Sequence, residues 1–178
     1  MYIIVVGCGR LGSNLAKELA NEGNDICILE RDGKKLESLG TNFNGKTVNG
    51  IEFDSENLAE AGIESADAVL AVSPDDNINL TVSLIADRIF KIPKVIARVN
   101  NPKNRLLYQK LNIDTVNPIK YESDLIKSKL SLDYVNLISV FDKEFELIEI
   151  HVTRDRKISK EELETKFRCV VTFIKRDH

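Results

Sequence analysis

A glycine-rich turn near the start of the chain constrains the fold more than any other feature. The apolar run 3–6 is typical of a buried strand, and it leads directly into the motif GCGRLG at residues 7–12. In a dinucleotide-binding turn, Gly7 allows the tight turn, Gly9 lets the backbone approach a pyrophosphate, and Gly12 lets the next helix pack closely. That helix would point free N–H groups and its positive dipole end at phosphates. The motif therefore predicts a phosphate-binding turn, the alternative being a glycine-rich turn of another α/β fold.

An acid stands where such a turn needs one. Glu30 ends the next apolar run, 18 positions after Gly12, and it can accept hydrogen bonds from both hydroxyls of an adenosine ribose. Its neighbour Arg31 is the residue type that attracts a 2′-phosphate, but the acid takes the first position after the strand. We therefore expect NAD or an adenine nucleotide rather than NADP. The alternative for Glu30 is a surface acid beside a helix.

Strand-like and helix-like segments alternate along residues 1–117. This alternation predicts an α/β fold with a doubly wound, parallel, Rossmann-like sheet, whose ligands bind at the carboxyl ends of the strands. The expected ligand neighbourhood comprises 7–12, 30–32, 49–54 and 71–76. The expected strands are 3–6, 25–30, 46–49, 68–72, 94–98 and 115–117, and the expected helices are 10–21, 33–39, 54–61, 77–90 and 102–111.

The pattern changes after this region. We expect a nucleotide-binding domain over 1–131, which includes a crossover helix at 121–130, and a small partial α+β module over 132–178. Such a helix commonly packs on a second domain or a second subunit. In the module we expect strands at 136–141, 146–153 and 169–174, a surface His151 on the second of them, and a helix opened by a Ser159–Glu162 capping box.

Composition excludes several functional classes. The formal net charge of −3 argues against a nucleic-acid binder, and the 178 residues contain no 18-residue apolar run that would span a membrane. The first strand begins too early to leave room for a signal peptide, and the cysteines imply no disulfide framework, so we expect a reducing, cytosolic setting. The three cysteines lack metal-ligand spacing, and with only two histidines most acid/base and metal chemistries are not expected.

Three side chains near the expected site allow two interpretations each. A cation is unfavourable at the N-terminal end of a helix, so the position of Arg10 favours a role in neutralising phosphate charge over that of a merely solvated arginine. Cys8, between two glycines, is expected to be buried rather than a reactive thiol. One of Asp75 and Asp76 is expected to cap the following helix, the alternative being a paired acid or metal site.

Six motifs taken in order resemble a known family. Together they are similar to the nucleotide-binding domain of the Trk/Ktr potassium-uptake regulatory subunits, the RCK or KTN family. The resemblance covers residues 1 to about 131, and 135–178 resemble the first half of that family's C-terminal module. The motifs are GCGRLG at 7–12, ERD at 30–32, LAEAGI at 58–63, ADAV at 66–69, AVSPDDNIN at 71–79 and IARVNNP at 96–102.

This resemblance implies a regulatory role without enzymatic activity. Family members bind NAD(H) or adenine nucleotides such as ATP, ADP or AMP. They form homo-oligomeric rings, as dimers within a tetramer or octamer, on the cytoplasmic face of a membrane potassium transporter or channel made by a separate polypeptide. The implied location is therefore cytoplasmic and peripheral at the inner face of the cell membrane, and bound nucleotide changes the shape of the ring.

The resemblance also assigns roles by position. It places Arg10 at the phosphates and Arg31 beside the adenine. The family's Gly-Asp-x-Thr after the third strand is replaced here by GIEFD at 50–54, which leaves Asp54 as the acid that could point inward. No catalytic and no metal residues are expected. The candidate cofactor-binding residues are Gly7, Cys8, Gly9, Arg10, Leu11, Gly12, Glu30, Arg31, Asp54, Ala71, Val72, Ser73, Asp76, Asn79 and Arg98.

Two other functions remain open at this stage. An NAD-dependent oxidoreductase would need an acid/base residue at the nicotinamide, and none is evident in the sequence. A soluble sensor module without a transporter would use the same site. We therefore expect ligand-linked shape change in a regulatory subunit.

Overall fold

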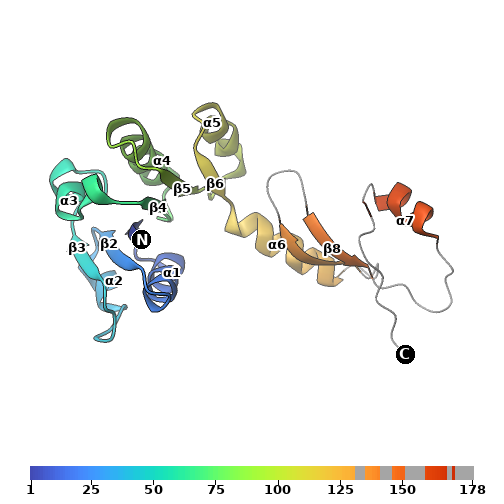
Figure 1. The fold of residues 1–178 in the computed structure, drawn as a ribbon, viewed down its shortest axis with the longest axis horizontal. Helices are drawn as coiled ribbons and strands as arrows, with labels where there is room; N and C mark the ends of the chain where they lie inside the picture. The colour runs from blue at the N-terminus through green and yellow to red at the C-terminus, as the bar shows by residue number, and fades with distance from the viewer. Residues whose placement is uncertain (131–134, 141–145, 151–158, 168–169, 171–178) are drawn as a thin grey trace. The chain divides into compact units, whose positions relative to one another are not determined.

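A parallel sheet forms the centre of the N-terminal part of the chain (Figure 1). The computed structural model describes residues 1–130, 135–140, 146–150, 159–167 and 170. The chain divides into two compact units, Met1–Lys120 and Tyr121–His178. The division after residue 131 that the sequence predicts stays a prediction.

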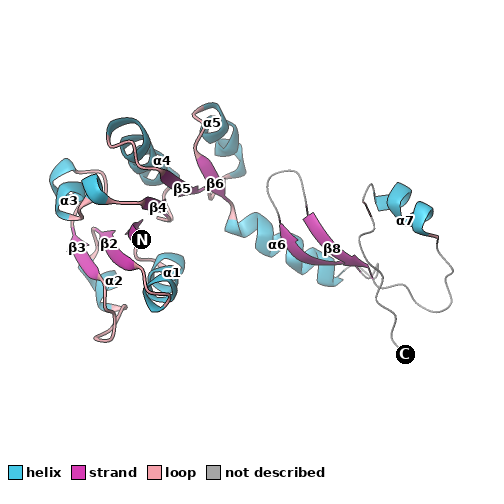
Figure 2. Cartoon of the chain, in the orientation of Figure 1, coloured by secondary structure: helices cyan, strands magenta, loops and turns pink. Residues whose placement is uncertain are grey.

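The strands of the first unit are ordered β3-β2-β1-β4-β5-β6, and every neighbouring pair is parallel. The order reverses between β1 and β4, which is the switch point of a doubly wound fold. The predicted α/β class is therefore confirmed (Figure 2). The strands are β1 (Tyr2–Val6), β2 (Asp25–Glu30), β3 (Lys46–Asn49), β4 (Ala68–Ala71), β5 (Lys94–Arg98) and β6 (Asp114–Val116).

Helices cover the sheet on both faces because each strand-to-strand crossover carries one. The apolar residues of α1 and α2 pack in one cluster, and those of α3, η1 and α4 in another. The helical segments are α1 (Arg10–Asn21), α2 (Gly33–Glu37), α3 (Ser55–Glu60), η1 (Ile63–Ser65), α4 (Asp76–Leu84), η2 (Ile85–Ile89), η3 (Pro102–Asn104), α5 (Arg105–Lys110) and α6 (Pro118–Leu130).

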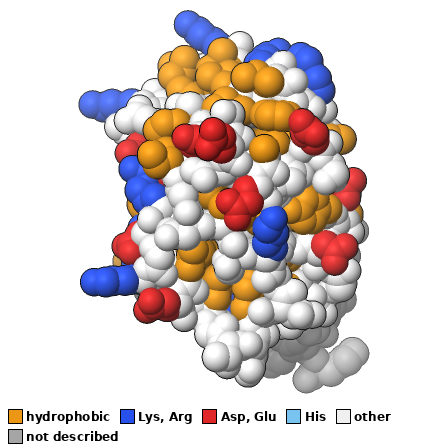
Figure 3. Space-filling model, turned by 90° about the vertical axis from the view of Figure 1, so that its left-hand side faces the viewer, with side chains coloured by type: hydrophobic (Ala, Val, Ile, Leu, Met, Phe, Trp, Pro, Cys, Tyr) orange, Lys and Arg blue, Asp and Glu red, His pale blue; other side chains and the backbone are white. Residues whose placement is uncertain are grey.

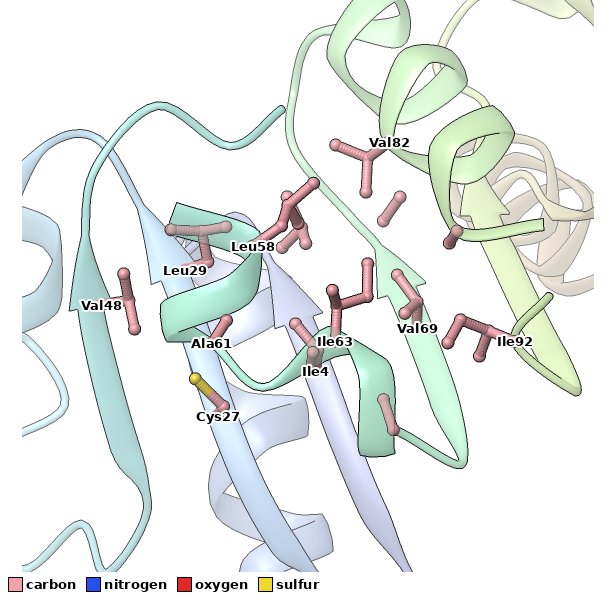
Figure 4. Packing of buried hydrophobic residues seen from close by; sticks show 14 of the residues in the cluster. Ile4, Cys27, Leu29, Val48, Leu58, Ala61, Ile63, Val69, Val82 and Ile92 are labelled. Atoms are coloured by element: carbon pink, nitrogen blue, oxygen red, sulfur yellow. The ribbon is translucent and has the colours of Figure 1, made fainter. Parts of the chain in front are cut away.

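The core lies against both faces of the central strands. Ile4, Val5 and Val6 of β1 are completely buried, as expected for a central parallel strand. Figure 4 shows one side of this core, where Ile4 and Val69 from the sheet gather with side chains from α3, η1 and α4. Such burial supplies the main favourable term in folding, about 25 cal/mol per Å² of apolar surface.

Three predicted helices differ from the structure in detail. The helix expected at 77–90 begins at Asp76 and becomes a π-helix over Ile85–Ile89, and the one expected at 102–111 opens with a 3₁₀ turn. Apolar spacing marks the buried face of a helix, but it does not distinguish one type of helical turn from another. The predicted helix at 121–130 begins earlier, at Pro118, a residue type suited to a first helical turn.

The described part of the second unit contains an antiparallel pair, β7 (Val135–Val140) and β8 (Glu146–Ile150), and the helix α7 (Lys160–Phe167). The capping box is confirmed, because the Ser159 Oγ accepts from the Glu162 N–H and the Glu162 carboxylate accepts from the Ser159 N–H, both at 3.1 Å. Of the predicted strand at 169–174 only Val170 is described, and it is not assigned to a strand. Residues 141 and 151–153 of the other two predicted strands, and therefore His151, lie outside the described residues.

The approach of α1 to β1 generates a stability prediction. A Cβ atom on Gly12 would lie 1.9 Å from the Gly7 carbonyl oxygen, whereas a Cβ on Gly9 would meet nothing within 4 Å. Gly12→Ala should therefore destabilise the first unit by about 3 kcal/mol or more, because backbone atoms must move apart. Gly9→Ala is the matched control and should change the free energy of unfolding by no more than about 1 kcal/mol, because only the preference for glycine over alanine at the N-cap is lost. Urea denaturation measures both, and equal effects would contradict the prediction.

Candidate functional site

The glycine loop lies between β1 and the N-terminus of α1, at the switch point of the sheet. Gly7 has a φ of +101°, and a Cβ there would lie 2.8 Å from the backbone of Ser73, so this position requires glycine. Gly9 is the N-cap of α1 and has no side chain to fill the capping position. The first helical hydrogen bond runs from Ser13 N–H to the Gly9 carbonyl at 2.9 Å, so the preceding helical N–H groups are left for a ligand or water.

The acid at the end of β2 is part of this loop. Glu30 is 2% exposed, and its Oε2 accepts the N–H of Cys8 at 2.9 Å. Its Oε1 accepts the N–H of Asp32 at 3.1 Å and the Lys35 ammonium at 3.3 Å. A carboxylate offers about four acceptor positions. Glu30 therefore both holds the loop in place and keeps limited capacity to accept a ligand hydroxyl.

The segments that follow β2 and β3 are joined by an ion pair, Arg31–Glu52, that sequence reasoning missed. Arg31 bonds the carboxylate of Glu52 through Nε, at 2.8 and 3.0 Å, and through Nη2, at 2.7 Å. This hydrogen bond and the negative charge of Glu52 raise the pKa of the guanidinium. Glu52 is 2% exposed. In the sequence, the segment GIEFD at 50–54 has its acids at positions other than that of the family's Gly-Asp-x-Thr. This difference points to Glu52 only once the fold is known.

Asp54 has a local role in the structure. Its Oδ1 accepts the N–H of Glu56 at 2.8 Å, and it is the exposed N-cap of α3. Asp75 caps α4 in the same way, through the N–H of Asn77 at 2.8 Å. The prediction that one acid of the Asp75–Asp76 pair caps the helix is therefore confirmed.

The other candidate acid and amide connect the loops after β4 and β5. Asn79, which is fully buried, accepts the Ser73 N–H and donates to the Ser73 and Arg98 carbonyls, at 2.8, 2.8 and 2.9 Å. Asp76 accepts the backbone N–H groups of Asn100 and Asn101, at 2.7 and 2.9 Å. These contacts occupy the polar atoms of both candidates and shape the edge of the site.

The electrostatics of Asp76 follow from the same contacts. Burial on its own raises the pKa of this carboxyl group, but the hydrogen bonds from Asn100, Asn101 and Asn104 outweigh burial and lower the pKa. The Asn104 amide lies 2.8 Å from Oδ2. The Tyr108 hydroxyl, buried beneath, donates to the Asp76 carbonyl at 2.8 Å. The carboxylate is therefore the form that the fold selects.

The remaining candidates lie on the same edge. Ala71 and Val72 are buried at the end of β4, next to the loop glycines, while Arg10 is exposed on the first turn of α1. Arg98 ends β5, and its Nε is buried without a hydrogen-bond partner among the described residues. Leu11, on the first turn of α1, is partly buried against the hydrophobic cluster beneath that helix. The edge thus gathers the predicted loop, Glu30 and the residues that follow β4 and β5.

Thiol and metal chemistry find no support here. Burial, and then the charge of Glu30, raise the pKa of the Cys8 thiol, which donates to the Lys35 carbonyl at 3.2 Å. A raised thiol pKa disfavours the reactive thiolate. Within the described residues, no three His, Cys, Asp or Glu side chains are grouped to hold a metal ion.

The charges and the apolar character of the described surface and helices bear on other kinds of partner. On the face drawn in Figure 3, acidic and basic side chains are interspersed, without the continuous basic stripe of a nucleic-acid binder. Over the part of the chain that the structure describes, none of the helices has the length and apolar character needed to cross a membrane.

Known proteins resemble this chain in sequence and in fold. The model of the family described as TrkA-N domain matches residues 3–118. The chain is 39% identical over 130 residues to the Trk system potassium uptake protein TrkA of Streptomyces coelicolor, an alignment that covers 73% of this chain and 58% of that relative. The chain thus spans less than two thirds of the length of that protein.

Two solved structures share the fold. The AMP-bound Kef CTD of Shewanella denitrificans is 18% identical, with a TM-score of 0.61, over 72% of this chain and 77% of that one. The GsuK channel bound to NAD is 20% identical, with a TM-score of 0.56, over 65% of this chain and 21% of that one.

The Asp76 contacts predict a pH dependence. Because the folded-state pKa of Asp76 is lowered, the stabilisation is complete above the ordinary Asp pKa, about 4, and is lost as the pH falls through the lowered value. Asp76→Asn should lower the free energy of unfolding by about 1–3 kcal/mol at pH 7, since the amide NH₂ of the new side chain would face N–H donors that now bond the carboxylate. The variant should also lose less stability than the wild type between about pH 4 and pH 2. Urea denaturation at several pH values tests this, and parallel pH profiles would contradict it.

Proposed function

The chain belongs to the TrkA-N domain family, and from that premise we propose that it is a nucleotide-sensing regulatory subunit of a membrane potassium transporter or channel. The ligand is NAD(H) or an adenine nucleotide such as ATP, ADP or AMP. The observation that carries this proposal is the joint geometry of the loop and its acid. Gly9 opens the N-terminus of α1 to solvent, while Glu30 lies buried against the Cys8 N–H of the same loop.

Chemistry and relatives support the ligand class. A helix N-terminus without a side-chain cap is a ready anion site, and a phosphate supplies the acceptors that its N–H groups lack. Arg10, exposed on the first turn, would neutralise phosphate charge. Two structures of the same fold are described as bound to AMP and to NAD, which have adenosine in common.

The regulatory part of the proposal extends to assembly and location. The named relative is a potassium uptake protein. This supports a transporter or channel subunit as the partner, and in this proposal the partner is a separate polypeptide. In this proposal the chain forms a homo-oligomer at the cytoplasmic face of the membrane and performs no catalysis. Bound nucleotide shifts the population of assembled states by no more than its difference in affinity for them.

Two measurements test the proposal directly. Calorimetric titration of the full chain with NAD, NADH, ATP, ADP and AMP should show saturable binding of at least one of them. Native mass spectrometry, with and without that nucleotide, reports the copy number and the bound species together. Absence of binding by all five nucleotides would refute the proposal.

A substitution at Gly9 separates binding from folding. Gly9 has extended backbone angles, φ −76° and ψ −172°, which suit an aspartate N-cap. In Gly9→Asp the carboxylate should accept the N–H groups that the phosphate would use. We expect nucleotide affinity to fall more than about a hundredfold, while stability stays equal or rises by up to about 1 kcal/mol.

The control for this variant is Asn21→Asp, which adds the same charge at the exposed C-terminal end of α1. Its nucleotide affinity should match that of the wild type. If Gly9→Asp binds nucleotide as tightly as this control, the phosphates do not bind at the glycine loop.

A further inference from the structure

Glu52 is a buried carboxylate in the loop after β3. It is 2% exposed, and among the described residues Arg31 supplies every hydrogen bond that it accepts. Two guanidinium nitrogens take part, which is the geometry of a strong charge-assisted pair. A buried acid whose only partner is one arginine is costly to separate from it, because the carboxylate would be left desolvated and unpaired.

The arginine is fixed from both ends. Its carbonyl accepts the side-chain amide of Asn49 at 3.0 Å, and the same amide donates to the Glu30 carbonyl at 3.0 Å. Its guanidinium is held by Glu52. Arg31 also follows directly after the acid that binds the glycine loop, so it lies at the ribose end of the proposed site.

Lys35, a second cation near the end of β2, is also paired with a carboxylate. Lys35 lies 3.3 Å from Oε1 of Glu30, so Arg31 and Lys35 each have a buried carboxylate as partner. A 2′-phosphate on the ribose brings about two negative charges, and its binding needs cationic groups whose hydrogen-bond donors are free. The positive charges of Arg31 and Lys35 are already neutralised by Glu52 and Glu30.

We propose, on the basis of the proposed nucleotide site, that Glu52 is a specificity-determining residue: it binds Arg31 and thereby withholds the guanidinium from a 2′-phosphate. The site then takes adenosine nucleotides with a free 2′-hydroxyl and rejects NADP and other 2′-phosphorylated forms. Glu30 alone does not decide this selectivity, because a free arginine beside it would attract the phosphate. The Arg31–Glu52 pair completes the selection.

The test compares two ligand pairs that differ only by the 2′-phosphate: NAD with NADP, and AMP with adenosine 2′,5′-bisphosphate. Dissociation constants are measured by calorimetry on the full chain. Wild type should bind the ligand without the 2′-phosphate more tightly. Glu52→Gln should reduce that preference about tenfold or more, because a neutral amide holds Arg31 weakly and a phosphate hydrogen-bonds the freed guanidinium.

Two further variants control the interpretation. Glu56→Gln removes the same charge from an exposed neighbour on α3 and should leave the preference unchanged. The double variant Arg31→Gln with Glu52→Gln should return the preference to within about threefold of the wild type, because the freed arginine is gone. Thermal unfolding monitors folding, and Glu52→Met takes the place of Glu52→Gln if the latter does not fold.

Distinct results separate this inference from the proposed function. Wild type that binds neither these four ligands nor NADH, ATP or ADP refutes the nucleotide site itself. Wild type that binds NADP as tightly as NAD overturns the role of Glu52 while the site stands. An unchanged preference in Glu52→Gln, or a double variant that keeps the relaxed preference, overturns it too, since Arg31 would then not be the group that is released.

Discussion

The close contact between α1 and β1 is the constraint on which the rest of the site depends. Gly12 passes so near the Gly7 carbonyl that even a methyl group is excluded, which brings the helix N-terminus to the end of the first strand. From there the Cys8 N–H reaches the Glu30 carboxylate at the end of β2. One backbone contact thus fixes a helix terminus, a loop and an acid in a single arrangement.

Three buried polar side chains around this edge have defined partners, whereas the buried Nε of Arg98 has none among the described residues. Glu30 has the loop and Lys35, Glu52 has Arg31, and Asn79 spans the ends of β4 and β5. Buried charges without partners are costly, so such pairings are expected wherever loops converge on a sheet edge. They also limit what a ligand can use, because a group that is already bonded is less available to it.

Much of the fold could be predicted from the sequence, and the reasons are local. The apolar runs around Ile4 and Val69 predict buried parallel strands, and the acids at Asp54 and Asp75 precede helical patterns as caps do. The π-helical turn at Ile85–Ile89 could not be predicted, because its apolar spacing is compatible with an ordinary helix. The resemblance assigned Asp76 and Asn79 to the ligand, whereas their hydrogen bonds in the structure connect neighbouring loops.

The sequence by itself determined the glycine loop, the acid that follows it and the alternating order of strands and helices, because each depends on residue type and short spacing. Only the tertiary structure decided which carboxylate meets which cation. Arg31 and Glu52 are distant in sequence and approach each other because β2 and β3 are neighbours in the sheet. Which groups stay free for a ligand depends on such long-range pairings, which spacing along the chain does not encode.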